Sequence, residues 1–224
     1  RIREGMAKAA IRAGRAPGDI TLMGVTKFHP LAAARAAWAA GLRVFGESRV
    51  QEAEAKFAGT EADFPGLRLD LIGNLQSNKA KKALGLFTTI QSVDSLDLLR
   101  ELDRRARQGG QTPDILFELH TGEESKAGFP SLDALLEACD LLCSLGPVEG
   151  GGLRLRGLMS MAPFTQDEAL VRASFRRLAK ARDILQARYP DFLLDTLSMG
   201  MSNDYSLAIE EGSTLVRIGT DIFG

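Results

Sequence analysis

The sequence is poor in the residues that build disulfide-bonded or metal-stabilised folds. Its 224 residues include two cysteines and two histidines. The cysteines, Cys139 and Cys143, lie four apart in one apolar segment, which favours helix packing in a reducing compartment over a disulfide framework. The histidines, His29 and His120, are distant from both cysteines along the chain. We therefore predict no metal-ligand cluster and assign neither histidine a catalytic role.

Neither sign of charge is in excess, and long apolar runs are missing. Lys and Arg number 28 against 29 Asp and Glu, a formal net charge of -1 that argues against nucleic acid or an anionic membrane as partner. No run approaches the ~20 apolar residues of a membrane-spanning helix, and Arg1–Met6 lacks the apolar centre of a signal peptide. We expect a cytoplasmic protein that binds a small molecule.

The sequence does contain a regular alternation of short, apolar, β-branched runs with longer helical patterns. This alternation is typical of βαβ units around a parallel sheet. Eight strands are predicted, the number that closes a barrel, so we expect a single (β/α)8 TIM barrel domain over residues 1–224. The strands are expected near Ile20–Val25, Leu42–Phe45, Leu67–Ile72, Thr88–Gln91, Ile115–Leu119, Leu153–Leu158, Thr196–Ser198 and Leu215–Ile218.

Helical patterns fill the intervals between these runs, and one more precedes the first strand. The early pattern, Arg3–Ala13, ends at Gly14 and is expected to lie across the barrel bottom as a plug. Another has Asp94 or Ser95 as its N-cap and Gly109-Gly110 at its end. The helices after the first strand are expected near Leu31–Ala40, Val50–Phe57, Asn78–Leu84, Leu96–Gln108, Leu132–Leu142, Glu168–Arg188 and Tyr205–Glu211.

Lys27 is the first residue with candidate chemistry, because the active groups of a β/α barrel stand where strands end. It follows the first predicted strand, and a period of two places its side chain on the face of Met23 and Val25. An amine that is desolvated at a barrel mouth keeps a larger neutral fraction, which is the form that attacks an aldehyde. A surface lysine at a strand end is the alternative.

Two segments after the seventh and eighth strands could together hold a phosphate. In the segment Ser198–Asp204, Gly200 allows a close turn, and Ser202 offers a hydroxyl and an N-cap position at the start of the next helix. Gly219 and Thr220 follow the last strand, where this fold usually binds phosphate. Taken alone, the first segment is also an ordinary capped helix start.

Arg217 lies within the last predicted strand, in phase with Leu215. An arginine buried at a barrel mouth needs an acceptor, which a cofactor's ring nitrogen or a carboxylate could supply. A structural ion pair with Glu or Asp is the alternative. A further segment, Ile72–Lys79, ends the third strand and opens a helix with Ser77 or Asn78 as cap.

These motifs together resemble the pyridoxal 5'-phosphate (PLP) homeostasis proteins, relatives of the barrel domain of bacterial alanine racemase. The resemblance covers nearly the whole chain and implies the barrel of fold-type III PLP proteins. The last two of its segments are the most specific. It is carried by Val25–Lys27, Phe45–Glu47, Ile72–Lys79, Arg156–Met159, Leu197–Ser202 and Gly212–Gly224.

The resemblance implies that Lys27 carries PLP as a Schiff base and that Arg217 faces the pyridine nitrogen. An arginine there would keep that nitrogen unprotonated, which weakens the ring as an electron sink and suits storage or limited chemistry. The phosphate would be held by residues after the seventh and eighth strands. The predicted cofactor-binding residues are Lys27, Asn78, Met201, Ser202, Arg217, Gly219 and Thr220.

The chain departs from the usual pattern of that family at several positions. Ser48 stands where Asn is usual, Asp70 where His is usual, and His120 where Asn is common. The connection that carries the family's Glu-x-x-Lys-x-Gly motif is one residue shorter, and the motif appears as Glu123, Lys126 and Gly128. The departures leave pocket details and PLP affinity open, but not the Schiff base.

Three functions are compatible with these residues. The favoured one is a PLP carrier in intracellular PLP homeostasis, without robust catalysis, as a monomer rather than a dimer and with PLP-dependent apoenzymes as candidate recipients. The alternative is a PLP-dependent, racemase-like enzyme, which needs a second acid/base group. Tyr205 lies near the phosphate segment, but a packing role at its helix start is favoured. The third is a metal-free phosphosugar enzyme in which Lys27 is a general base or phosphate contact.

Overall fold

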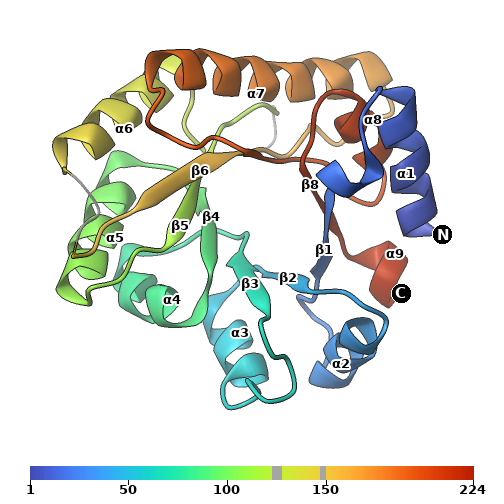
Figure 1. Cartoon of the computed structure of the whole chain (residues 1–224), viewed down its shortest axis with the longest axis horizontal. Helices are drawn as coiled ribbons and strands as arrows, with labels where there is room; N and C mark the ends of the chain where they lie inside the picture. The colour runs from blue at the N-terminus through green and yellow to red at the C-terminus, as the bar shows by residue number, and fades with distance from the viewer. Residues whose placement is uncertain (123–127, 147–149) are drawn as a thin grey trace.

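The computed structural model describes residues 1–122, 128–146 and 150–224. Eight parallel strands pair in chain order, and β8 pairs with β1, so the sheet closes into the predicted barrel (Figure 1). The strands are β1 (Thr21–Val25), β2 (Val44–Glu47), β3 (Arg68–Leu71), β4 (Thr89–Val93), β5 (Asp114–Glu118), β6 (Arg154–Met159), β7 (Thr196–Ser198) and β8 (Leu215–Ile218).

Helices surround the barrel, and most begin where the sequence predicts (Figure 1). Ser95 caps α5 by accepting the N–H of Leu98, and Gly109 ends that helix. The predicted helix near Asn78 is divided into a 3₁₀ turn, η2 (Ser77–Lys79), and α4 (Ala80–Leu86). The remaining helical elements are α1 (Ile2–Arg12), η1 (Pro17–Asp19), α2 (Leu31–Ala39), α3 (Val50–Phe57), α5 (Leu96–Gln108), α6 (Leu132–Ser144), α7 (Glu168–Arg188), α8 (Tyr205–Glu210) and α9 (Thr220–Phe223).

Two strands extend beyond the apolar runs that predicted them. β2 continues to Glu47, beyond its predicted end at Phe45, and β4 continues through Ser92 to Val93, beyond its predicted end at Gln91. The three polar residues are fully buried. An apolar run therefore underestimates a strand wherever buried polar groups have hydrogen-bond partners, as these do.

The expected plug across the barrel bottom is wrong. Helix α1 packs against α8 and the outer face of β8, because α8 is only six residues long and leaves that face to be covered. The two helices approach so closely that a Cβ added at Gly5 would lie 2.3 Å from the Tyr205 hydroxyl oxygen. The expected packing role of Tyr205 is thereby confirmed. The buried apolar residues that form the hydrophobic cluster around α1, α8 and β8 are Met6, Ala9, Ala10, Ile20, Ile209, Val216 and Ile218.

The main hydrophobic core fills the layer between the barrel and its outer helices. Its largest fully buried side chains include Phe45, Phe117 and Phe175, and burying one such ring contributes roughly 2–3 kcal/mol. On α6, Cys139 is buried as predicted, whereas Cys143 is exposed, so the packing prediction is wrong for Cys143. None of the helices in the described part of the chain is both long and apolar enough to span a bilayer.

Candidate cofactor site at the barrel mouth

Lys27 lies in a tight turn just beyond β1. The N–H of His29 donates to the Thr26 carbonyl at 3.0 Å, and Phe28 has a φ of 66°, which is unusual for an aromatic residue. The strand alternation stops before this turn, so the Lys27 side chain is exposed. The expected desolvation of its amine is therefore wrong. Within the described residues, the Lys27 Nζ has no hydrogen bond or ion pair and lies 6.0 Å from the Phe28 ring centroid.

The segment after β7 forms a close turn beside β8. Gly200 has a φ of 96°, and its carbonyl accepts the Arg217 N–H at 2.9 Å. Asp204 Oδ1 accepts the Met201 N–H at 2.6 Å and occupies the N-cap position of α8, so the predicted capping role of Ser202 is wrong. Burial raises the pKa of Asp204. The Ser202 hydroxyl has no hydrogen-bond partner among the described residues and is available to a ligand.

The end of β8 brings Gly219 and Thr220 next to the strand that precedes Lys27. The β1–β8 register pairs Gly24 with Ile218, and a Cβ added at Gly219 would meet Val25 at 3.6 Å and no other atom more closely. The space in front of Gly219 is therefore open. Thr220 is exposed, and its hydroxyl, like that of Ser202, has no partner in the part of the chain that the structure describes.

Arg217 is buried at 4% exposure, yet no described carboxylate lies within ion-pair distance of it. Its Nη1 donates to the carbonyl and hydroxyl oxygens of Ser198 at 2.7 and 2.8 Å, and its Nη2 donates to the Ser160 carbonyl at 2.8 Å. Burial lowers the pKa of Arg217 to about 10, so the guanidinium is still protonated at neutral pH. The structural ion pair considered for Arg217 is therefore not formed by the described residues.

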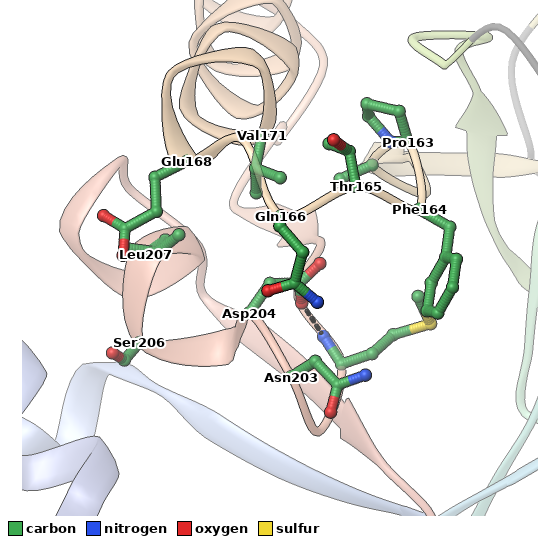
Figure 2. Close-up of a pocket in the computed structure, with 12 residues that line it drawn as sticks. Pro163, Phe164, Thr165, Gln166, Glu168, Val171, Asn203, Asp204, Ser206 and Leu207 are labelled. Carbon is green, nitrogen blue, oxygen red and sulfur yellow. Dashed lines mark hydrogen bonds between the residues drawn. The ribbon is translucent and has the colours of Figure 1, made fainter.

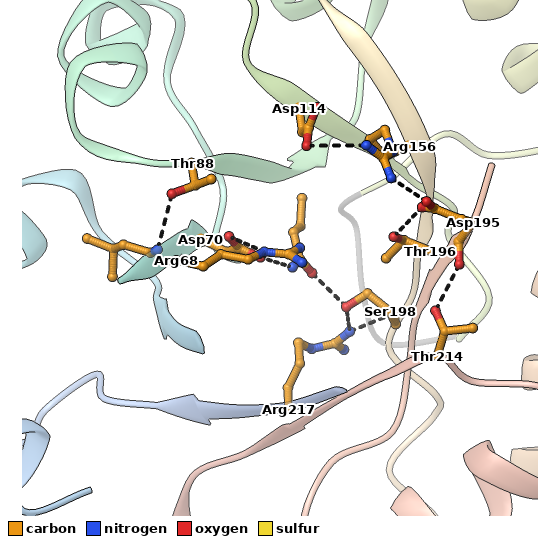
Figure 3. Close-up of polar contacts among 12 residues, drawn as sticks. Arg68, Asp70, Thr88, Asp114, Arg156, Asp195, Thr196, Ser198, Thr214 and Arg217 are labelled. Atoms are coloured by element: carbon orange, nitrogen blue, oxygen red, sulfur yellow. Dashed lines mark hydrogen bonds and ion pairs between the residues drawn. The ribbon is translucent and has the colours of Figure 1, made fainter. Parts of the chain in front are cut away.

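From Ser198, which Arg217 contacts, a chain of hydrogen bonds crosses the barrel interior (Figure 3). The Ser198 hydroxyl donates to Gln91 Oε1 at 2.6 Å, and Gln91 Nε2 donates to Asp70 Oδ2 at 2.7 Å. Because β7 and β4 are not neighbours in the barrel, the Ser198–Gln91 bond must cross its interior. Asp70 also pairs with Arg68 at 2.9 Å. We call Arg68, Asp70, Gln91 and Ser198 the interior column.

Two groups next to Arg217 were not singled out from the sequence. Ser160 is fully buried, and its hydroxyl oxygen has no hydrogen-bond partner in the described ranges of the chain. Glu118 ends β5 at 4% exposure, and burial raises its pKa to about 7, with the charge of Arg217 opposing that rise and Asp94 adding to it. Ser160 and Glu118 are both polar residues at the end of a buried apolar run, and that position is the feature of the sequence that could have identified them. A buried cation and an unpartnered hydroxyl fit a polar ligand with acceptor atoms.

The other sequence-predicted positions lie apart from this cluster. Asn78 is exposed in η2, and no described contact joins it to the rest of the predicted set. Asp70, a departure from the family pattern, lies in the interior column, and Ser48 lies against Gly73, whose added Cβ would meet the Ser48 carbonyl oxygen at 2.3 Å. His120 is half-buried, and its Nδ1 has no hydrogen-bond partner among the described residues. The predicted motif residues Glu123 and Lys126 lie outside the described residues.

A cavity of about 790 Å³ adjoins the segment after β7. It lies between the loop that follows β6 and the first turn of α8, with Phe164 and Glu168 at different ends and Gln166 beside Asp204 (Figure 2). Of the predicted cofactor-binding residues, only Met201 lines it. The cavity therefore neighbours the predicted site without containing it.

Comparisons with known proteins agree on the family. Residues 7–224 match the model of the alanine racemase N-terminal domain. The chain is 42% identical, over 227 residues, to the pyridoxal phosphate homeostasis protein of Pseudomonas aeruginosa, covering all of this chain and 90% of the relative. It is 38% identical to that of Aquifex aeolicus, covering all of this chain and 95% of the relative.

Solved structures give the same result. PipY of Synechococcus elongatus, solved with PLP bound, is 40% identical and superposes with a TM-score of 0.84, with each chain covered completely. Alanine racemase of Clostridium difficile shares the fold at a TM-score of 0.69 and 13% identity, and 56% of that longer chain is covered. The chain thus belongs to the alanine racemase N-terminal domain family and, within it, to the pyridoxal phosphate homeostasis proteins.

Proposed function

We propose that this protein carries PLP on Lys27 and serves in PLP homeostasis. The observation that carries the proposal is that, among the described residues, the accessible Lys27 amine has no hydrogen bond or ion pair and lies at the same barrel mouth as the unpartnered Ser202 and Thr220 hydroxyls and the buried guanidinium of Arg217. A relative of 40% identity, PipY, has PLP bound. When bound, PLP supplies an aldehyde that condenses with the lysine amine and releases water, together with a phosphate and a ring nitrogen that accepts hydrogen bonds.

The residues of this chain divide the binding between them. Ser202 and Thr220 would donate their hydroxyls to the phosphate, and Gly219 would leave room for it. Arg217 has five N–H donors, of which three are used by Ser198 and Ser160. The remaining two are available to the ring nitrogen. A guanidinium that donates there holds the nitrogen as an unprotonated acceptor, which favours storage over carbanion chemistry.

Other features of the proposal concern the setting of the carrier. We propose a cytoplasmic monomer that passes PLP to PLP-dependent apoenzymes, and two free cysteines support a reducing compartment. Racemase-like chemistry is the second candidate, and Glu118 favours it, because a buried carboxyl with a pKa of about 7 suits a general acid or base. Exchange of the α-proton of an amino acid with deuterated solvent, lost in Glu118→Gln, would support that second candidate.

The test of the carrier proposal is the site of covalent attachment. We expect wild-type protein loaded with PLP to retain the cofactor on Lys27 after borohydride reduction, located by peptide mass spectrometry, and to lose this product in Lys27→Ala. Lys81→Ala, which removes an exposed lysine of α4, is the matched control and should behave as wild type. A reduced product on other lysines alone, or none, would contradict the proposal. Binding of sugar phosphates without PLP would then favour the phosphosugar alternative.

A further inference from the structure

A buried ion pair lies behind the turn that carries Lys27. Glu47 is fully buried, and its Oε1 lies 2.6 Å from Nζ of Lys56, whose side chain is 11% exposed. Lys56 Nζ also donates to the Thr26 carbonyl at 2.6 Å, and the Thr26 hydroxyl donates to Glu47 Oε1 at 2.6 Å. Three short contacts thus join Thr26, the residue before Lys27, with β2 and α3, two of them made by Thr26 itself and one between Glu47 and Lys56. We call Thr26, Glu47 and Lys56 the clamp.

The clamp acts on the backbone of the turn. The Thr26 carbonyl accepts two donors, the Lys56 ammonium and the His29 N–H, and the Thr26 N–H donates to Gly46 at 3.0 Å. Both backbone polar groups of Thr26 are therefore fixed. Because Lys27 is the next residue, the direction in which its side chain leaves the barrel depends on these bonds.

The turn needs such support because its conformation is unfavourable. The left-handed φ of Phe28 brings its Cβ close to backbone atoms, and a phenylalanine lacks the local hydrogen bonds that make this conformation easier for Asn or Asp. The Phe28 side chain is 78% exposed, so burial of its ring does not hold the turn. Besides the clamp and the backbone hydrogen bonds of Thr26, a contact between the rings of His29 and Phe223, with centroids 5.0 Å apart, also holds the turn.

The chemistry of the clamp favours a positioning role over a stabilising one. Glu47 Oε2 is buried without a hydrogen-bond partner among the residues that the structure describes, and a buried ion pair with an unsatisfied oxygen is a weak source of stability, because desolvation opposes the Coulomb attraction. A cation with a buried counter-ion behind a reactive lysine is nevertheless able to fix a strained backbone.

We propose that Glu47 and Lys56 are positioning residues that hold the Lys27 turn so that its amine meets the aldehyde of PLP bound through its phosphate at Ser202 and Thr220. The inference rests on the proposed function. The neutral Lys27 nitrogen adds to the aldehyde carbon, the aldehyde oxygen leaves as water, and an imine remains. The equilibrium of imine formation depends on how often the amine is correctly placed. A loosened turn therefore lowers the fraction of PLP bound covalently but not the affinity of the site for the phosphate.

The experiment compares PLP with pyridoxine 5'-phosphate, which has an alcohol in place of the aldehyde and cannot form the imine. In Lys56→Met, we expect the apparent affinity for PLP to fall by about tenfold or more and that for pyridoxine 5'-phosphate to stay within about twofold. The His29 amide of the cofactor-free variant should exchange hydrogen faster, because its acceptor is no longer fixed. Lys82→Met removes a lysine from the solvent-exposed pair with Glu54 and is the matched control.

Two variants of Thr26 sharpen the test without removing a charge. Thr26→Val loses the hydroxyl that donates to Glu47 and should show a smaller loss for PLP alone, whereas Thr26→Ser keeps the hydroxyl and should restore wild-type behaviour. If Lys56→Met does not fold, these two Thr26 variants still test the positioning role. Equal weakening of both ligands, or wild-type PLP affinity together with unchanged His29 exchange, would overturn the positioning role.

Failure of the proposed function has a separate signature. If wild-type protein forms no borohydride-stable product on Lys27, the carrier proposal is lost, but hydrogen exchange at His29 in the cofactor-free variants still decides the clamp. Faster exchange in Lys56→Met and Thr26→Val supports the control of the turn by Glu47 and Lys56. Exchange at the wild-type rate in both variants contradicts the control of the turn by Glu47 and Lys56.

Discussion

The interior column and the barrel mouth treat their polar groups in opposite ways, although β7 contributes to both, with Ser198 at its end and Ser202 in the segment that follows. In the column, Asp70, Gln91 and Ser198 are buried and joined by hydrogen bonds of 2.6–2.7 Å. At the mouth, the Lys27 amine and the Ser202 and Thr220 hydroxyls have no described partner. Water or a ligand can satisfy groups at the mouth, whereas the column must satisfy itself. Full pairing therefore marks the side chains that hold the barrel and unpartnered groups mark those that are free to bind, whereas Arg217, paired through three of its five N–H donors, belongs to both classes.

Breaking the column should have the largest effect on stability. Gln91→Met takes one hydrogen bond from Asp70 and one from Ser198, each of which keeps an arginine partner. A hydrogen bond contributes about 0.5–1.5 kcal/mol between neutral groups and about 1.5–3 kcal/mol with a charged group, so we expect a loss of roughly 3 kcal/mol in the free energy of unfolding. Urea denaturation measures it. Gln108→Met, at an exposed position of α5, should change stability by less than about 0.5 kcal/mol. Equal effects of the two substitutions would show that the column is not structural.

Glu118 lies between the two regions, and its titration should be visible in stability. Its folded-state pKa of about 7 exceeds the ordinary value of 4.5, so the folded protein holds a proton that the unfolded chain releases between these values. Its contribution is complete below pH 4.5 and is lost as pH rises through 7. Glu118→Gln removes this dependence, so the variant should gain up to about 3 kcal/mol over wild type at pH 8.

Urea denaturation of wild type and Glu118→Gln from pH 5 to 8.5 measures this difference directly, because the other titrating groups largely cancel between the two proteins. Glu137→Gln, at an exposed position of α6, is the control and should show a constant difference across that range. A constant difference for Glu118→Gln as well would mean that Glu118 is not held in a protonated form by burial.

The fold followed from the sequence because it depends on local patterns. Strand β8 and helices α3, α5 and α7 coincide with their predicted residues, since apolar periodicity and caps such as Ser95 are local signals. The place of α1 did not follow. It depends on how much of β8 the short α8 leaves uncovered, and no local pattern carries that information.

The places of the candidate site residues were predicted in part, for the same reason. Strand ends placed Lys27, Ser202 and Thr220 at one mouth of the barrel, and their roles in binding stay predictions. The exposure of Lys27 depends on the turn at Phe28, which no strand period foretells. The clamp was missed because Glu47 and Lys56 become partners only when α3 packs on β2. Buried ion pairs between elements depend on tertiary packing, which local sequence patterns do not predict.

The smallest effects on stability, and the clearest on binding, should come from the mouth. Ser202→Ala and Thr220→Val remove hydroxyls without a described partner, so each should change the free energy of unfolding by less than about 0.5 kcal/mol. Each should weaken PLP by about tenfold, or about 1.4 kcal/mol, with additive losses in the double variant. Thr112→Val, an exposed position without described side-chain contacts, is the control and should leave binding unchanged.

The choice of ligand makes this last prediction specific to the mouth. Because Ser202 and Thr220 would act on the phosphate, their variants should weaken pyridoxine 5'-phosphate as much as PLP, measured by equilibrium titration of both. Variants of the clamp should weaken the binding of PLP alone. Gln91→Met should lower the free energy of unfolding more than it weakens the binding of either ligand. A selective loss of affinity for PLP in Ser202→Ala would place that hydroxyl near the aldehyde instead. It would contradict the assignment of Ser202 to phosphate binding and of the clamp alone to placement of the amine.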